Sequence, residues 1–208
     1  QIRSAGAPLK TKGGRATGPE PLRVMLEFVR KRVLARQGSL LRPIDAHDIM
    51  CAVGNAAVQG GVRRTAMISL FDYDDEEMRL CKSGDFEREN SQRWNANNSM
   101  VLPSGGVTQL DFAKIFLEMV ESGRGEPGIF NREAAAAMVP PRRMQADWGT
   151  NPCGEIVLRP FEFCNLSIAV ARQGDDYESL KDKVEVATII GTIQAMATDF
   201  KGLRPPWR

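Results

Sequence analysis

The sequence predicts an α/β fold. Three features of its 208 residues support this prediction: amphipathic segments with helical spacing, short apolar runs, and the alternation of the two along the chain. Such alternation is typical of helices layered against a sheet. No internal repeat interrupts the pattern, and its only low-complexity tract is the alanine run at 134–137, which favours helix.

The N-terminal part should contain two helices and a strand. Apolar residues recur at helical spacing over 22–38, with charged residues between them. A second helix is expected after Pro43, with Asp45 and Asp48 as capping residues and an end at Gly60-Gly61. The apolar run 65–71 predicts a buried strand.

The remaining elements are expected to be shorter, with one exception. The polar stretch 72–98 predicts a short helix mixed with irregular structure. The exception is a long helix over about 177–200, which is apolar on more than one side and should therefore be well buried. Two helices and two strands are expected between them, at 111–121, 131–138, 155–158 and 166–171.

Charge and composition exclude several classes of protein. The 28 basic and 26 acidic side chains leave a net charge of +2, which argues against a nucleic-acid or membrane-surface protein. No apolar stretch reaches the roughly 18 residues of a membrane helix, and the start lacks a signal-peptide core. The four cysteines lack a disulfide-framework spacing, which suits the cytoplasm. The first residue is not Met and the last residues lack a terminal cap, so we expect an internal fragment.

The most informative segment joins Cys153 to Cys164. Pro152 fixes its own φ and Gly154 permits a close turn, so Cys153 should lie at the tip of a short, stiff loop. Cys164 lies at the far end of an apolar strand. It could return to Cys153 through the turn at Arg159-Pro160 or through an adjacent strand.

Two polar neighbours of Cys153 could give this loop a role in binding or catalysis. Asn151 offers donors and an acceptor for a hydroxylated ligand, and Glu155 offers a base two residues beyond the thiol. Free cysteines are more often small buried hydrophobes, and that interpretation stays open beside the redox one. A zinc site is disfavoured, because short-spaced ligands are absent and His47 is the single histidine. We predict no metal ligands.

The segment around the two cysteines resembles a known family. Asn-Pro-Cys-Gly-Glu at 151–155, followed by Cys-Asn-Leu at 164–166, is similar to the active-site finger of ribonucleotide reductases, most closely the adenosylcobalamin-dependent (class II) ribonucleoside-triphosphate reductases. Further blocks resemble the family in the same order, so the resemblance covers nearly the whole chain. They lie at 13–22, 60–66, 96–99 and 127–133.

The resemblance implies roles for individual residues. Cys153 matches the cysteine that becomes a thiyl radical and abstracts the 3′ hydrogen of the ribose. Glu155 matches the carboxylate that takes the proton of the 3′ hydroxyl, and Asn151 matches the amide that hydrogen-bonds the sugar. Cys164 matches one of the two cysteines that end as a redox-active disulfide, with its partner upstream of this chain.

The resemblance also implies a fold and a setting. The fold is a ten-stranded α/β barrel with the active-site loop at its centre, of which residues 1–208 are part of a single catalytic domain truncated at both ends. Adenosylcobalamin would be the cofactor, a ribonucleotide the substrate, a deoxynucleotide the effector and a thioredoxin-like protein the reductant, in deoxyribonucleotide synthesis for DNA replication. Cys51 and Cys81 do not match the second redox cysteine, so we interpret both as packing residues.

A second motif follows the expected second helix. Gly60 and Gly61, with Arg63 and Arg64, could cradle phosphate, because glycines expose backbone amides and arginines make forked contacts. The alternative is a helix C-cap followed by solvated charges. By resemblance, this run lies near the loop that relays effector identity, which favours a regulatory role.

Other interpretations remain open. Asn97, Asn98 and Ser99 could line a substrate pocket or form an ordinary turn. His47 is expected to be a surface residue at a helix start and not a base or a cobalt ligand. The alternative to a reductase is a truncated, non-catalytic α/β module that binds nucleotides. In either case the isolated chain should be inactive.

Overall fold

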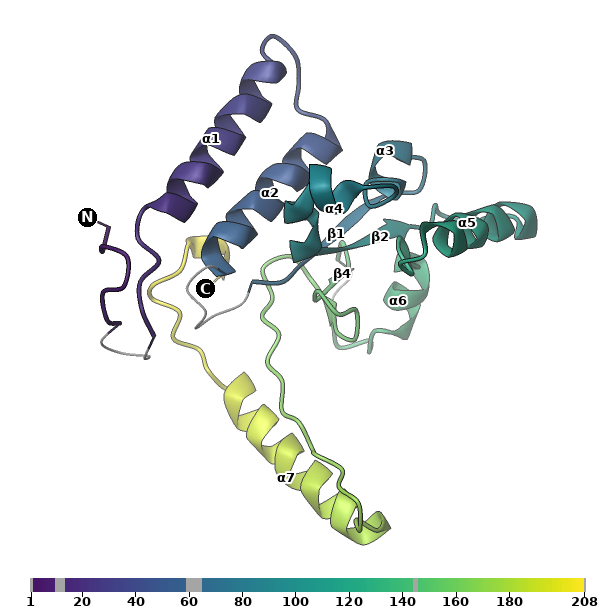
Figure 1. Cartoon of the computed structure of the whole chain (residues 1–208). Helices are drawn as coiled ribbons and strands as arrows, with labels where there is room; N and C mark the ends of the chain where they lie inside the picture. The colour runs from purple at the N-terminus through teal and green to yellow at the C-terminus, as the bar shows by residue number, and fades with distance from the viewer. Residues whose placement is uncertain (1, 10–13, 59–64, 144–145, 208) are drawn as a thin grey trace.

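Two antiparallel helices, α1 (Glu20–Ala35) and α2 (Pro43–Val58), lie side by side in the N-terminal part of the chain (Figure 1). The structure is a computed structural model, and it describes residues 2–9, 14–58, 65–143 and 146–207. Both helices were predicted. α1 begins with proline and Glu20 in its first turn, and Arg23 pairs with both Glu20 and Glu27 on its exposed face.

The expected caps of α2 were half right. Asp45 lies in the first turn and accepts a hydrogen bond from the backbone N–H of Arg42 at 3.1 Å. Asp48 is not a cap. It is fully buried and forms ion pairs with Arg93 at 2.6 Å and with Arg32 at 2.9 Å. Asp48 therefore joins the two helices to the segment around Arg93.

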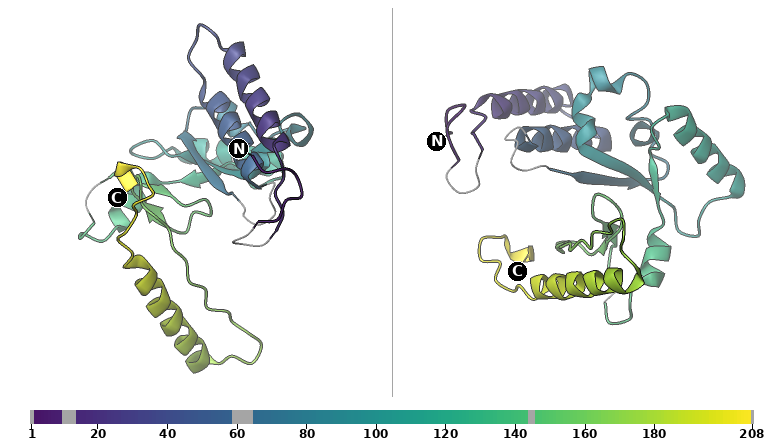
Figure 2. Two further views of the ribbon diagram at one scale, coloured as in Figure 1. Left: turned by 90° about the vertical axis from the view of Figure 1, so that its left-hand side faces the viewer. Right: turned by 60° about the horizontal axis from the view of Figure 1, so that its bottom comes forward.

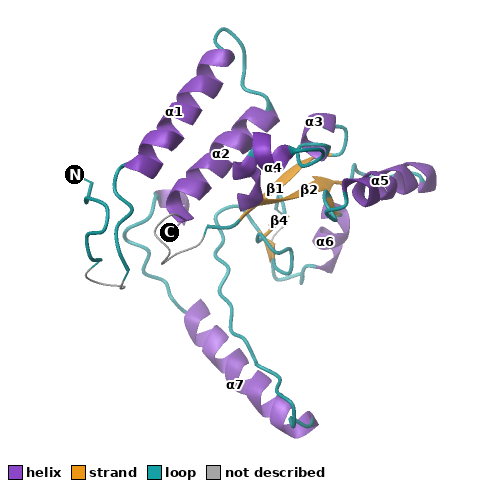
Figure 3. Ribbon diagram, viewed as in Figure 1, coloured by secondary structure: helices purple, strands orange, loops and turns teal. Residues whose placement is uncertain are grey.

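A parallel sheet lies beside α2 (Figure 3). Its order is β1 (Met67–Asp72), β2 (Ala96–Val101) and β3 (Gly128–Phe130). The expected strand at 65–71 is confirmed as β1, although it is mostly half-buried, with Phe71 buried and Asp72 exposed. β2 was not predicted, because we expected irregular structure up to residue 98. It alternates regularly, with Ala96, Asn98 and Met100 buried.

The core lies between this sheet and the surrounding helices. It is formed by Ile44, Phe71, Met78, Cys81, Met100 and Ile115. These residues come from α2, β1, β2, α5 (Gln109–Ser122) and the segment that contains α3 (Glu76–Arg79). The short helix expected in the 72–98 stretch is present as α3, and α4 (Phe86–Glu89) and the 3-10 helix η1 (Ser91–Asn95) follow it.

Local capping explains the two helices that follow β2. Thr108 caps α5 by accepting a hydrogen bond from the backbone N–H of Asp111 at 3.2 Å, and Gly123 ends the helix with φ 65°. Asn131 caps α6 (Arg132–Met138) through the backbone N–H of Ala134 at 2.9 Å. Both helices were predicted within two residues at each end.

The C-terminal part differs most from expectation. β4 (Gly149–Thr150) and β5 (Val157–Leu158) form an antiparallel hairpin, so the strand expected at 155–158 is present but shorter. The strand expected at 166–171 is wrong: these residues form no strand and run alongside α7 (Tyr177–Ala195) (Figure 1). The chain ends near the short 3-10 helix η2 (Pro205–Trp207).

The expected burial of the long helix is also wrong. α7 has no buried residue, and Val186, Ile189 and Ile193 on it are all more than half exposed. Figure 2 shows α7 lying apart from the α1–α2 pair. A helix that is apolar on several sides is buried only if other elements pack against each of those sides. Among the described residues, the segment around 166–171 packs along one side of α7.

The fold class is confirmed as mixed α/β with a small parallel sheet. The described strands form two separate sheets, of three and two strands, and these do not close into a barrel. The ten-stranded barrel and the single truncated domain therefore remain predictions. Within the described ranges, no helix is both long and apolar enough to cross a membrane.

Candidate functional site

The loop 151–156 of the β4–β5 hairpin carries the first candidate thiol. Asn151 closes this loop in three ways. Its backbone N–H donates to the carbonyl of Ile156 at 3.1 Å, its carbonyl accepts from the N–H of Gly154 at 3.0 Å, and its side-chain oxygen accepts from the N–H of Ile156 at 3.0 Å. Gly154 has φ 88°, a conformation that favours glycine. The local sequence thus dictates a tight, internally bonded loop.

The three predicted catalytic side chains share this loop but differ in exposure. Asn151 is buried, with 6% of its surface exposed, whereas Cys153 and Glu155 are exposed. The Asn151 oxygen accepts one hydrogen bond within the loop, so its carboxamide nitrogen, with two N–H donors, has the larger capacity left for a ligand. The exposed thiol and carboxylate are free of the core and lie two residues apart in the chain, with Gly154 between them.

A side chain from the parallel sheet supports the thiol loop. The side-chain nitrogen of Asn97, on β2, donates to the carbonyl of Pro152 at 2.7 Å. This bond fixes the peptide immediately before Cys153. Asn97 therefore lies on a strand and not in a turn, and its place in the wall of a substrate pocket stays a prediction. An asparagine pair within a strand is a weak sequence signal that could have indicated such a contact.

A second set of contacts holds the turn that leads to Cys164. The carboxylate of Glu162 accepts hydrogen bonds from the backbone N–H and the Nε of Arg159, each at 2.7 Å, and also pairs with Arg143. Burial works to raise the pKa of Glu162, but the Arg159 hydrogen bonds and the Arg143 charge outweigh it, and the pKa is lowered. Cys164, two residues later, is exposed.

The other two cysteines are buried, as expected for packing residues. Burial raises the pKa of Cys51 to about 12 and that of Cys81 to about 11, so both thiols stay protonated at neutral pH. His47 was expected at the surface, and this was wrong. It is buried, its Nδ1 lies 2.7 Å from the Ser69 hydroxyl, and burial lowers its pKa to about 4. Packing of α2 on β1 encloses it.

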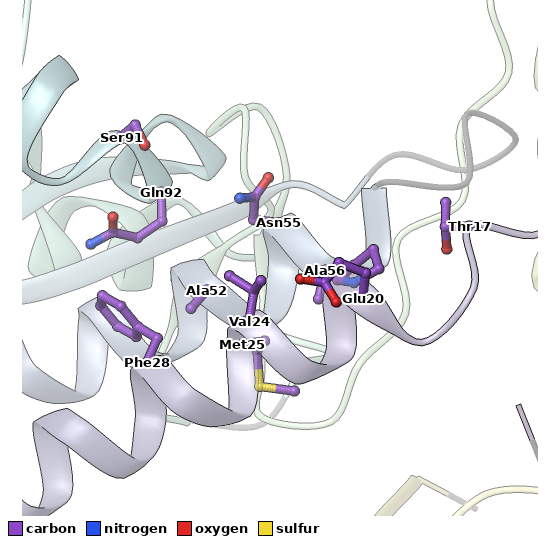
Figure 4. Close-up of a pocket in the computed structure, with 11 residues that line it drawn as sticks. Thr17, Glu20, Val24, Met25, Phe28, Ala52, Asn55, Ala56, Ser91 and Gln92 are labelled. Atoms are coloured by element: carbon purple, nitrogen blue, oxygen red, sulfur yellow. The ribbon is translucent and has the colours of Figure 1, made fainter. Parts of the chain in front are cut away.

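A cavity of about 460 Å³ lies between α1, α2 and η1 (Figure 4). Apolar side chains such as Val24, Met25 and Phe28 line most of it, and Asn55 and Gln92 bring polar groups to its wall. None of the exposed cysteines borders this cavity. It is therefore separate from the thiol loop.

Two further predictions concern the effector loop and metal binding. Gly60, Gly61, Arg63 and Arg64 lie outside the described residues, so the proposed effector loop stays a prediction. Among the residues that the structure does describe, no group of three or more histidine, cysteine or acidic side chains could hold a metal ion.

Comparison with known proteins shows a consistent similarity. The chain is 39% identical over 172 residues to the adenosylcobalamin-dependent ribonucleoside-triphosphate reductase of Lacticaseibacillus paracasei, and 37% identical over 171 residues to that of Lactobacillus leichmannii. Each match covers 79% of this chain and 22% of the relative, so the chain spans about a fifth of the length of these proteins. No family model and no solved structure matches the chain.

Proposed function

We propose that this chain, a homologue of part of the adenosylcobalamin-dependent ribonucleoside-triphosphate reductases, carries the reactive thiol loop of such an enzyme. One observation supports this most directly. The chain has four cysteines, and the two that are exposed are the two in the Asn-Pro-Cys-Gly-Glu to Cys-Asn-Leu segment. An exposed thiol can be reached by a substrate, and the tightly bonded loop holds it in one position.

The proposed chemistry assigns each side chain one task. Cys153, as a thiyl radical, takes the 3′ hydrogen atom of the ribose, while Glu155 takes the proton of the 3′ hydroxyl. Asn151 contacts the sugar through its side-chain nitrogen, because its oxygen is bonded to Ile156. Cys164 and a second cysteine from elsewhere in the polypeptide supply two electrons and two protons, so the 2′ hydroxyl leaves as water and a disulfide forms.

In this proposal the cofactor acts on the Cys153 thiol, and the chain supplies no ligand to its cobalt through His47. Adenosylcobalamin would supply the hydrogen-atom abstraction that converts the Cys153 thiol into a radical. Cys153 is exposed and can be approached, whereas His47 is buried against Ser69 and unavailable as a cobalt ligand. What this chain contributes is placement of the thiol.

The wider setting belongs to the same proposal. Ribonucleoside triphosphates would be the substrates, as the names of the relatives indicate. A deoxynucleotide effector would act through Gly60, Gly61, Arg63 and Arg64, which join α2 to β1. A thioredoxin-like reductant would restore the disulfide, the whole protein would form the ten-stranded barrel, and the enzyme would work in the cytoplasm.

A chimera tests this proposal. The chain replaces the matching segment of the Lacticaseibacillus paracasei reductase, and deoxynucleotide formation is measured with adenosylcobalamin and a dithiol. We expect turnover that Cys153→Ser abolishes, because a hydroxyl is a far poorer hydrogen-atom donor than a thiol. Cys81→Ala, at a buried cysteine, is the control and should keep activity.

Two results would count against the proposal. Turnover retained in Cys153→Ser would refute the assigned role of that thiol. A chimera that is folded by circular dichroism and binds the cofactor, yet forms no product, would favour the non-catalytic nucleotide-binding module instead.

A further inference from the structure

We propose that Arg143 and Glu162 are positioning residues that set the separation of the two exposed thiols. This inference rests on the proposed function, in which Cys153 and Cys164 act on one substrate. Neither residue belongs to the thiol loop 151–156. Their importance comes from the two segments that they join.

Arg143 connects the hairpin to the turn that follows it. One terminal nitrogen of its guanidinium donates to the carbonyl of Val157, on β5, at 3.2 Å, and the other bonds the carboxylate of Glu162. The guanidinium carbon also lies 4.6 Å from the ring centroid of Trp148, which is 1% exposed. A forked side chain resting on a buried ring has little freedom to move.

Glu162, which pairs with Arg143, also closes the turn 159–162. It accepts from the backbone N–H of Arg159, and its other oxygen lies 2.6 Å from the second terminal nitrogen of the same arginine. The Arg159 contacts are local, three residues apart, and shape only the turn. The Arg143 contact spans 19 residues and is the one that ties the turn to the hairpin.

The position of these contacts explains why they bear on the thiols. The pairing of β4 with β5 holds the chain in place from the Cys153 loop as far as Leu158, where β5 ends. The residues between Leu158 and Cys164 are not held by strand pairing. Glu162 lies two residues before Cys164. Both side chains are largely withdrawn from solvent, with 24% and 22% exposed, so the ion pair is less screened than a surface pair. Phe163 also stacks on Phe200, with 4.9 Å between the ring centroids. This contact could hold Cys164 in place as well, so its effect must be measured apart from that of the Arg143–Glu162 pair.

Spin labelling of the full 208-residue chain measures the separation directly. Nitroxide labels are attached to Cys153 and Cys164, while the buried Cys51 and Cys81 stay unmodified. Electron paramagnetic resonance then gives the distribution of label distances. We expect a single narrow distribution in the wild type, and a distribution at least twofold broader in Glu162→Gln and in Arg143→Met.

Matched variants separate positioning from general stability. Glu178→Gln removes an exposed ion pair on α7 and should leave the distribution unchanged. Arg143→Lys keeps the charge but loses the planar fork that bonds Glu162 and Val157 at once. It should therefore broaden the distribution, but less than Arg143→Met, which also loses the charge. Melting temperatures are recorded for each variant, so that a broader distribution at an unchanged melting temperature reports position alone.

Three results would overturn the inference: a broad distribution in the wild type, an unchanged one in both Glu162→Gln and Arg143→Met, or broadening caused only by Phe200→Ala. The measurement involves no catalysis. A failure here would therefore leave the proposed roles of Cys153 and Cys164 standing, and a failure of those roles would leave the measured separation intact.

Discussion

Replacing Asp48 by asparagine should be the most destabilising conservative change in the described core. Its carboxylate is fully buried and is bonded by Arg93 at 2.6 and 2.9 Å, by Arg32 at 2.9 Å and by Gln92 at 3.1 Å. Asp48→Asn keeps the shape but takes the counter-charge from Arg93, whereas Arg32 still has the Asp45 carboxylate at 4.0 Å. Arg32 can turn to solvent, since 30% of its side chain is exposed, whereas Arg93 has only 11% exposed and cannot.

The expected loss follows from that difference. Removing one partner of a buried ion pair costs about 3–5 kcal/mol of the free energy of unfolding. For a chain of this length, that corresponds to a fall in melting temperature of about 6–20 °C. Urea unfolding followed by circular dichroism, with linear extrapolation to water, measures the free energy.

A surface ion pair provides the control. Glu27→Gln removes a pair with Arg23 on α1 in which both side chains are more than half exposed, and it should leave the free energy of unfolding almost unchanged because solvent screens the pair. A loss below about 1 kcal/mol in Asp48→Asn would show that the buried network does not hold α1, α2 and η1 together.

Two further predictions concern the thiol segment. Gly154→Ala should lower the free energy of unfolding by about 1–2 kcal/mol, because alanine is strained at φ 88°; Gly202→Ala, where no positive φ occurs, is the control, and equal losses in urea unfolding would contradict the argument. The pKa of Glu162 is lowered below its ordinary value of 4.5, so its contribution to stability should be fully present above pH 4.5 and lost as the pH falls through the folded-state pKa. Glu162→Gln should flatten the acid limb of the stability profile there, and an unchanged limb would show that the carboxylate is not held in the turn.

Features with a local cause could be predicted from the sequence. α5 and α6 follow from apolar spacing together with Thr108 and Asn131 as caps, and Gly123 marks an end. The tight loop around Cys153 follows from Pro152 and Gly154 in the same way. In each case residues within about one turn of a helix or one tight loop determine the structure.

Features with a distant cause could not be predicted. β2 contains Asn97-Asn98-Ser99, which favour turns, and it becomes a strand because β1 and β3 pair with it on both sides. The segment 166–171 has strand-like residues but no partner strand among the described residues. The Asn97–Pro152 and Arg143–Glu162 contacts join residues 55 and 19 positions apart, and no local pattern identifies the partner in either contact.

The exposure of α1 and α7 has a calorimetric consequence. Neither helix has a buried residue, so melting either one hydrates little additional apolar surface. The heat-capacity increment on unfolding should therefore come mainly from the region around the parallel sheet, and it should be small for a chain of this length. Amide protons of α7 should exchange with solvent long before those of β1 and β2, because α7 should unfold as a separate unit. Its unfolding should give no separate peak in the calorimetric scan.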